Sequence, residues 1–158
     1  LNELAFAPID VSDNAPIDEW SGDKGVGASY LSQQAAFRLA KISGIKTDPN
    51  LNNADYLAFL QELLSRGDHS ILQIWQTIGM YLGYAIAHYA DYYDFKHILS
   101  LGRVTSGKGG SIIVSKAKTI LGQEFPDLAE KITIHLPDEK SRRLGQSIVA
   151  ASLPIVKR

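Results

Sequence analysis

The sequence FKHILSLGRVTSGKGGSIIVSKAKTIL spans residues 95–121 and holds three consecutive patterns. Ile98, Leu99 and Leu101 form a short apolar run between polar residues, which is typical of a buried strand. Glycines then cluster within nine positions, and apolar residues recur at helical spacing from Ser111 onward (Gly102, Gly107, Gly109 and Gly110; Ile112, Ile113, Ala117, Ile120 and Leu121). A strand, a glycine loop and a helix in this order bring backbone N–H groups and a helix N-terminus to a phosphate or nucleotide, because glycine has no side chain to block the approach.

The composition is ordinary for a soluble globular protein, with 45% hydrophobic and 21% charged residues. A chain of 158 residues can build one domain with a real core, and we expect a single domain over residues 1–158. The net charge of −1 suggests no polyelectrolyte partner. Cysteine is absent, which excludes disulfides, thiolate zinc sites and cysteine nucleophiles.

No segment has the length of a membrane span, and a cytoplasmic protein is expected. The start at Leu1 suggests a fragment of a longer chain.

The remaining patterns alternate strands with helices and predict an α/β fold. Strands are expected at Leu4–Ile9, His97–Leu101 and Lys131–Leu136, all in one sheet. Helices are expected at Ala28–Ser43, Ala54–Arg66, Ser70–Asp91, from Ser111 onward, and at Lys140–Leu153 with Leu144, Ile148 and Ala151 facing inward. The stretch from Asp10 to Gly27, rich in Asp, Pro and Gly, is expected to be a long loop.

Gly79, Gly83 and Ala87 lie four residues apart on the third of these helices. Glycine costs up to about 1 kcal/mol in a helix interior relative to alanine, so two glycines on one face suggest a reason in packing. We therefore expect Gly79 and Gly83 to face a neighbouring helix or the sheet at short distance.

Two other interpretations of the glycine loop compete with nucleotide binding. Residues 102–108 match most of the phosphate-loop pattern G-x-x-x-x-G-K-[ST], but Gly109 stands where that pattern needs a magnesium-binding hydroxyl. The loop could also simply turn the chain between a strand and a helix.

Histidine and tyrosine give no clear site in the sequence. None of the histidines (His69, His88, His97 and His135) pairs with another at a spacing of four, so no metal site is expected. The tyrosines near the end of the third helix could form a base-stacking platform, but with only a neutral net charge around them core packing or an interface is favoured (Tyr81, Tyr84, Tyr89, Tyr92 and Tyr93).

Several segments in order resemble the carboxy-terminal half of the repressor–open-reading-frame–kinase (ROK) family of sugar kinase-like proteins, in the actin/hexokinase superfamily. Residues 2–6 resemble the family's G-E-x-G-H segment, and residues 22–32 fall on its cysteine-containing segment. Residues 78–83 resemble its long glycine-bearing helix, and residues 101–107 its L-G-G-G-V-S adenosine loop. Residues 144–147 lie where the family has a run of small residues. The resemblance implies part of an actin-like ATPase (ribonuclease H-like) domain, with a mixed sheet and packed helices.

The chain departs from this family at the zinc and sugar sites. Phe6 replaces the zinc-binding histidine and no cysteine is present, so no zinc is expected. Of the family's sugar-contacting residues only Glu3 is retained, and Ala28 stands where a second glutamate is usual. The D-x-G-x-T phosphate loop and the catalytic aspartate would lie upstream, so no catalytic residue is expected in this chain.

The resemblance implies the nucleotide-side half of an ATP-dependent carbohydrate kinase, inactive on its own. ATP would lie against the loop (Gly102, Arg103, Val104, Thr105, Gly107, Gly109 and Gly110), and Mg²⁺ would bind together with the upstream half. A small sugar would contact Glu3. The implied partners are the amino-terminal half of the fold and, as a further option, a second copy of the chain; no membrane is implied, and nucleic acid only through an upstream DNA-binding domain.

Two alternatives remain open at this stage. A non-catalytic ROK-like protein that senses sugar or regulates transcription would keep the fold and lose the chemistry. A free-standing interaction module would instead use the apolar and tyrosine-rich third helix.

Overall fold

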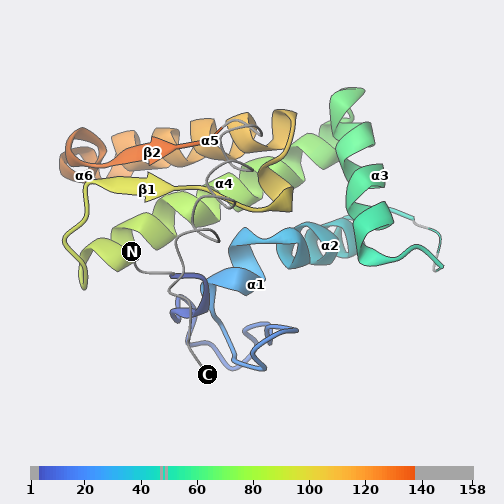
Figure 1. Ribbon diagram of the computed structural model, residues 1–158, viewed down its shortest axis with the longest axis horizontal. Coiled ribbons are helices and arrows are strands. Elements are labelled where there is room, and N and C mark those ends of the chain that lie inside the picture. Colours follow the sequence, from blue (N-terminus) through green and yellow to red (C-terminus); the bar gives the residue numbers. More distant parts are fainter. Residues whose placement is uncertain (1–3, 47, 49, 138–158) are drawn as a thin grey trace, which may run out of the picture.

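Two long helices, α4 (His69–Ala90) and α5 (Lys108–Glu124), lie side by side at the centre of the molecule (Figure 1). The computed structural model describes residues 4–46, 48 and 50–137. A Cβ atom added to Gly79 would lie 2.6 Å from the carbonyl oxygen of Ile113, and one added to Gly83 would lie 2.9 Å from Cβ of Ile120. Both glycines therefore allow the two helices to approach closely, and the expected packing role of Gly79 and Gly83 is confirmed.

The core is formed mainly by the apolar faces of these helices. Trp75 and Ile78 of α4 and Ala117 of α5 are almost completely buried, and α3 (Asn53–Ser65) contributes Leu57, Leu60 and Leu64. The side chain of Asn52 accepts hydrogen bonds from two backbone N–H groups in the first turn of α3, and the side chain of Asp68 accepts one, from the Ile71 N–H, in the first turn of α4. These caps supply partners for groups that the helix itself leaves unpaired, which explains where both helices begin.

The predicted helix at Ala28–Ser43 is wrong as a single element. The structure has two helices there, α1 (Gly27–Leu31) and α2 (Gln33–Ile42), with Ser32 in an extended conformation between them. The Ser32 hydroxyl accepts a hydrogen bond from the Gln34 N–H at 3.2 Å. Serine competes for backbone hydrogen bonds in this way, and it caps a new helix here instead of continuing the old one.

The sheet consists of β1 (His97–Leu99) and β2 (Thr133–His135), which pair in parallel with Ile98 opposite Ile134. Helix α5 and the short helix α6 (Pro126–Lys131) make the crossover between these strands; α6 was not predicted, although Pro126 at its first turn is a usual start signal. Ile134 of β2 is buried on the covered face of the sheet, whereas Leu99 is 51% exposed and Leu101 50%. The strands predicted at His97–Leu101 and Lys131–Leu136 are confirmed over His97–Leu99 and Thr133–His135. The expected burial of the first strand and its extension to Leu101 are wrong, because only one face of the sheet is covered in the part of the chain that the structure describes.

The strand expected at Leu4–Ile9 is also wrong. Leu4–Phe6 form a 3₁₀ turn, η1, and Pro8 makes only an isolated antiparallel bridge to Val26. Proline has no N–H to donate to a strand ladder, which limits pairing at this point. The Leu4 carbonyl instead accepts a hydrogen bond from the Tyr89 hydroxyl of α4 at 3.0 Å.

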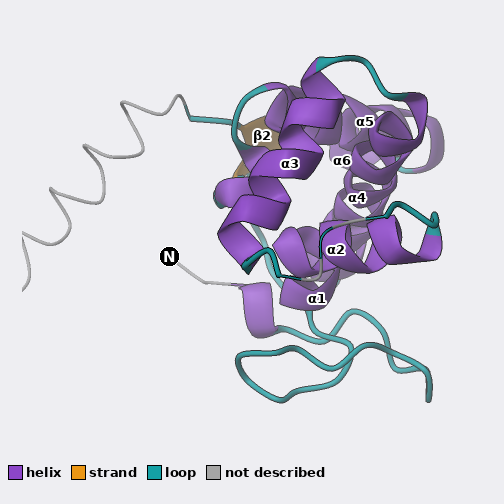
Figure 2. Ribbon diagram, turned by 90° about the vertical axis from the view of Figure 1, so that its right-hand side faces the viewer, coloured by secondary structure: helices purple, strands orange, loops and turns teal. Residues whose placement is uncertain are grey.

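The long loop between η1 and α1 is confirmed, and Figure 2 shows it projecting from the helical part of the molecule beside α1. Asp18 is 1% exposed and organises the loop. Its carboxylate accepts hydrogen bonds from the N–H groups of Trp20 and Ser21 and from the Gln34 side chain, at 3.0, 2.7 and 2.7 Å. A buried carboxylate with this many donors fixes the loop onto α2.

The described residues thus form a mostly helical structure with a two-stranded parallel sheet. The assignment to an actin-like α/β fold with a mixed sheet stays a prediction. The closing helix expected at Lys140–Leu153 lies outside the described residues. Within the described ranges, no helix is long and apolar enough to cross a membrane.

Candidate functional site

The glycine loop connects the end of β1 to the start of α5. Gly102 follows the strand with φ of +121°, the 3₁₀ turn η2 (Arg103–Thr105) comes next, and Gly107 precedes α5 with φ of +60°. The hydroxyl of Thr105 donates to the Gly102 carbonyl at 2.7 Å and closes the turn. The predicted order of strand, glycine loop and helix is confirmed, and both positive φ values explain why glycine is needed at these two positions.

The four loop glycines serve two different purposes. A Cβ atom added to Gly102 or Gly107 would meet nothing within 4 Å, so these two glycines lie on the open side of the loop. A Cβ on Gly109 would lie 2.7 Å from the Val104 carbonyl oxygen, and one on Gly110 would lie 2.8 Å from Leu136. Gly109 and Gly110 are buried, so their lack of a side chain is explained by packing inside the protein.

Val104 and Thr105 anchor the loop to the core. Val104 is 1% exposed, and its carbonyl oxygen accepts a hydrogen bond from the indole N–H of Trp75 at 3.1 Å. Thr105 is also buried. Of the seven residues predicted to bind a nucleotide, the exposed ones are therefore Gly102, Arg103 and Gly107.

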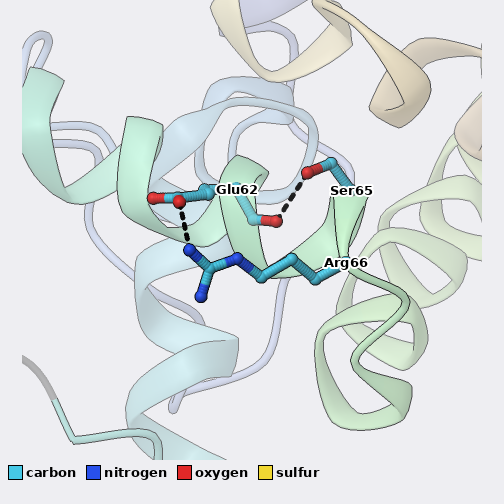
Figure 3. A network of polar contacts seen from close by, with 3 residues as sticks. All are labelled: Glu62, Ser65 and Arg66. Carbon is cyan, nitrogen blue, oxygen red and sulfur yellow. Dashed lines mark hydrogen bonds and ion pairs between the residues drawn. The ribbon is translucent and has the colours of Figure 1, made fainter.

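Lys108 does not extend over the loop as a phosphate-loop lysine would. Its ammonium donates a hydrogen bond to the Ser65 carbonyl at the end of α3, at 3.1 Å. A cation at the carboxyl end of a helix is favoured by the helix dipole. Figure 3 shows the same helix end, where Arg66 forms an exposed ion pair with Glu62 and the Ser65 hydroxyl donates to the Glu62 carbonyl. The contact of Lys108 opposes the phosphate-loop interpretation.

The start of α5 carries no side-chain cap, since Gly107 occupies the capping position. The first N–H groups of a helix have no partner within the helix and produce a local positive potential. Gly107 and Lys108 are exposed at the start of α5, whereas Gly109 and Gly110 in the same turn are buried, so any anion would approach from the side of Gly107.

The predicted sugar-contacting residue Glu3 lies outside the described residues. Phe6 is 41% exposed in η1, and Ala28 lies in α1. No group of three or more His, Asp or Glu side chains that could hold a metal ion occurs within the described residues. His97 and His135 do meet across the sheet, with Nδ1 of the first 3.0 Å from Nε2 of the second, a contact that the spacing along the chain could not reveal.

A second site was missed by sequence reasoning. A cavity of about 320 Å³ lies between α4, α1 and residues 9 and 10, at the start of the long loop. Its polar and aromatic walls come from Asp10, Tyr30, Tyr81, Tyr84 and His88. Tyr81, Tyr84 and His88 are spaced by three and four residues on α4, which places them on one helix face. That spacing is visible in the sequence, but the approach of Asp10 and Tyr30 is not.

Asp10 and Tyr30 are directly coupled in this cavity. The Tyr30 hydroxyl donates a hydrogen bond to Oδ2 of Asp10, and the Ser12 N–H donates to Oδ1 at 2.8 Å. The bond from Tyr30 is the main reason that the pKa of Asp10 lies below its ordinary value. Burial, together with the same bond, raises the pKa of Tyr30 well above 10. Asp10 is therefore an anion, and Tyr30 a neutral phenol, at physiological pH.

Comparisons with protein-family models, with curated proteins and with solved structures find no match to this chain.

Proposed function

We propose that this chain is the nucleotide-side half of an ATP-dependent carbohydrate kinase. The observation that carries the proposal is the open side of the loop between β1 and α5. There Gly102 and Gly107 are exposed and have no side chain, and α5, which has no side-chain cap, begins directly after Gly107. Backbone N–H groups at such a position bind nucleotides without any charged side chain. The resemblance to the ROK family assigns the adenosine, and not the transferring phosphate, to this loop.

The loop would contribute binding and orientation, not chemistry. Residues 102–110 contain no Asp or Glu, so these residues offer no carboxylate to the Mg²⁺ that accompanies ATP. The guanidinium of the exposed Arg103 could stack on the adenine ring or narrow the pocket. Proton removal from the sugar hydroxyl and the clamping of the phosphates would belong to the upstream half. Such an enzyme would work in the cytoplasm, where ATP is present.

The open face of the sheet supports a partner of this kind. Leu99 at the end of β1 and Leu101 just beyond it are half exposed, and parallel sheets are usually covered on both faces. In the proposed enzyme the amino-terminal half of the fold would pack against this strand. The same arrangement would bring that half next to the nucleotide loop.

The proposal is tested by titrating the 158-residue chain with ATP, AMP and adenosine, and by mapping backbone amide shifts. An adenosine loop should bind all three ligands with affinities within about tenfold of each other, with shifts centred on residues 102–107. Arg103→Glu should alter binding, and Lys118→Glu, an equal charge change at an exposed position of α5, should not. No binding of any adenine ligand would remove the kinase proposal.

One alternative is favoured by particular residues. Phe6 and Ala28 replace two of the family's sugar-site residues, which fits a ROK-like protein that keeps nucleotide or sugar binding without catalysis. This sensing or regulatory role would be preferred if the complete protein binds ATP but transfers no phosphate to any sugar.

A further inference from the structure

The cavity beside α4 has the features of a ligand site that the proposed kinase chemistry does not use. It joins three segments that are distant in sequence, through Asp10, Tyr30 and the α4 residues Tyr81, Tyr84 and His88. Its volume of about 320 Å³ is at the lower end of the range for small-molecule sites. The walls are mainly aromatic, which suits a ligand that is recognised through ring faces.

The charge of the cavity wall is negative. Asp10 is the only Asp or Glu that lines the cavity in the part of the chain that the structure describes, and no Lys or Arg lines it. Lys24 is close enough to influence Asp10, and the Arg38 guanidinium carbon lies 5.0 Å from the centre of the Tyr30 ring. These two cations stand beside the cavity and not in its wall, so a ligand inside it would meet the carboxylate directly.

Two of the tyrosine rings are polarised by carboxylates. Tyr30 donates its hydroxyl to Asp10, and Tyr84 donates to Glu124, with distances of 2.7 and 2.9 Å to the two carboxylate oxygens. A phenol that donates to an anion gains electron density on its ring, because hydrogen-bonded groups polarise one another. The negative ring face attracts cations, and the Arg38 contact shows that Tyr30 already does so.

A neutral polyol fits this cavity less well. The hydroxyls of Tyr30 and Tyr84 are both committed as donors to carboxylates, so neither can donate to a ligand oxygen. A sugar needs several donors and acceptors around it, and burying its hydroxyls without partners is costly. A methylated ammonium group needs only ring faces and one anion.

We propose that this cavity binds a small organic cation carrying an ammonium or methylated ammonium group, held by Asp10 and the rings of Tyr30, Tyr81 and Tyr84. The proposal does not depend on nucleotide binding or on kinase activity. A ligand that bridges α1, α4 and the segment at Asp10 would also fix the N-terminal part of the chain onto the helical core.

The test is a titration of the 158-residue chain with choline as the probe, followed by NMR shifts and calorimetry. The uncharged isostere dimethylbutanol is the matched ligand, since it has the same shape without the charge. Choline should shift the signals of the cavity residues and bind about tenfold more tightly than dimethylbutanol. Equal affinity of the two ligands, or tighter binding of glucose than of choline, would overturn the proposal.

Variants locate the site. Asp10→Asn and Tyr81→Leu should each weaken choline binding by about tenfold, and Tyr84→Phe, which keeps the ring but loses the bond to Glu124, by about twofold. Tyr93→Leu, at a tyrosine outside the cavity, should leave it unchanged. Thermal melts establish that each variant is folded, and Tyr84→Phe offers a test that removes no packing. If choline binds the three cavity variants as it binds the parent, or if Tyr93→Leu weakens binding as much as they do, the cavity is not its site and the proposal fails.

Discussion

Replacing Gly79 by alanine should destabilise the protein, although alanine is the better helix former. The gain in helix propensity is at most about 1 kcal/mol. The added Cβ, however, would lie 2.6 Å from the Ile113 carbonyl oxygen and 2.8 Å from Cβ of Lys116, and neither atom is the end of a flexible side chain. Helix α5 would have to move away, and such overpacking costs about 1–3 kcal/mol. The net loss should be about 1 kcal/mol, or a melting temperature lower by about 3 °C.

Gly122 provides the matched control for this substitution. It is an exposed glycine of α5, and an added Cβ would meet nothing within 4 Å. Gly122→Ala should therefore stabilise the protein by about 0.5 kcal/mol through propensity alone. Gly83→Ala should fall between the two, because its added Cβ would meet mainly the Ile120 side chain, at 2.9 Å.

Urea unfolding followed by circular dichroism measures the three differences on one scale, with the slope of the transition checking that the unfolding reaction is unchanged. If Gly79→Ala is as stable as Gly122→Ala, the close approach of α4 and α5 at this glycine is not real, and the reasoning from the added Cβ fails.

Three further predictions concern buried hydrogen bonds. Asp18→Ala leaves three donors without an acceptor and should lower the free energy of unfolding by about 3 kcal/mol. Limited proteolysis of this variant should cut the loop at residues 10–26 first. If the loop resists the protease as well as in the parent, Asp18 does not hold the loop in place. Burial disfavours the charged form of Asp18, but its hydrogen bonds outweigh that effect and lower its pKa in the folded protein. The contribution of Asp18 to the free energy of unfolding should therefore be complete above about pH 4 and be lost as the pH falls through this lowered pKa. Trp75→Phe deprives the Val104 carbonyl of its donor and should cost about 1–2 kcal/mol, with the largest amide shifts at the glycine loop and not at α3. Burial raises the pKa of Tyr89 to about 12. The contribution of Tyr89 to the free energy of unfolding should therefore be complete below about pH 10 and be lost as the pH rises through 12. The melting temperatures of the parent and of Tyr89→Phe should approach each other as the pH rises to that value.

The sequence allowed the central part of this fold to be predicted more closely than the N-terminal part. The apolar stripe of α4 and the glycines at positions 79 and 83 indicate a helix with a close neighbour. Glycine destabilises a helix interior, so its presence there suggests that close packing compensates for that cost. The break at Ser32 was missed, because a serine within a helical pattern is compatible with both continuation and capping. The strand expected near Leu4 was wrong, because weak alternation over six residues cannot outweigh a proline and a tertiary hydrogen bond from α4.

The candidate sites divide in the same way. The positions of the four loop glycines could be predicted, but their division into two exposed and two buried depends on Trp75 and Leu136, which lie on other elements. The aromatic cavity depends on Asp10 and Tyr30 meeting α4 across the fold. No periodicity within one helix contains that information, since it is a property of tertiary packing.

The order of elements along the chain has a consequence for how the molecule folds. Helix α4, β1, η2, α5, α6 and β2 follow one another along the chain, and α4 and α5 are joined by a connection of 17 residues. The N-terminal segment, by contrast, joins α4 through contacts such as those from Tyr89 to Leu4 and from His88 to Pro8, which are separated by 85 and 80 residues. Contacts between residues that are close in sequence close small loops and form early. Contacts between residues that are far apart in sequence cost more conformational entropy and form late. Residues 69–135 are therefore expected to make up the cooperative unit with the slowest amide exchange, and the segment before α1 to dock onto it last and open first.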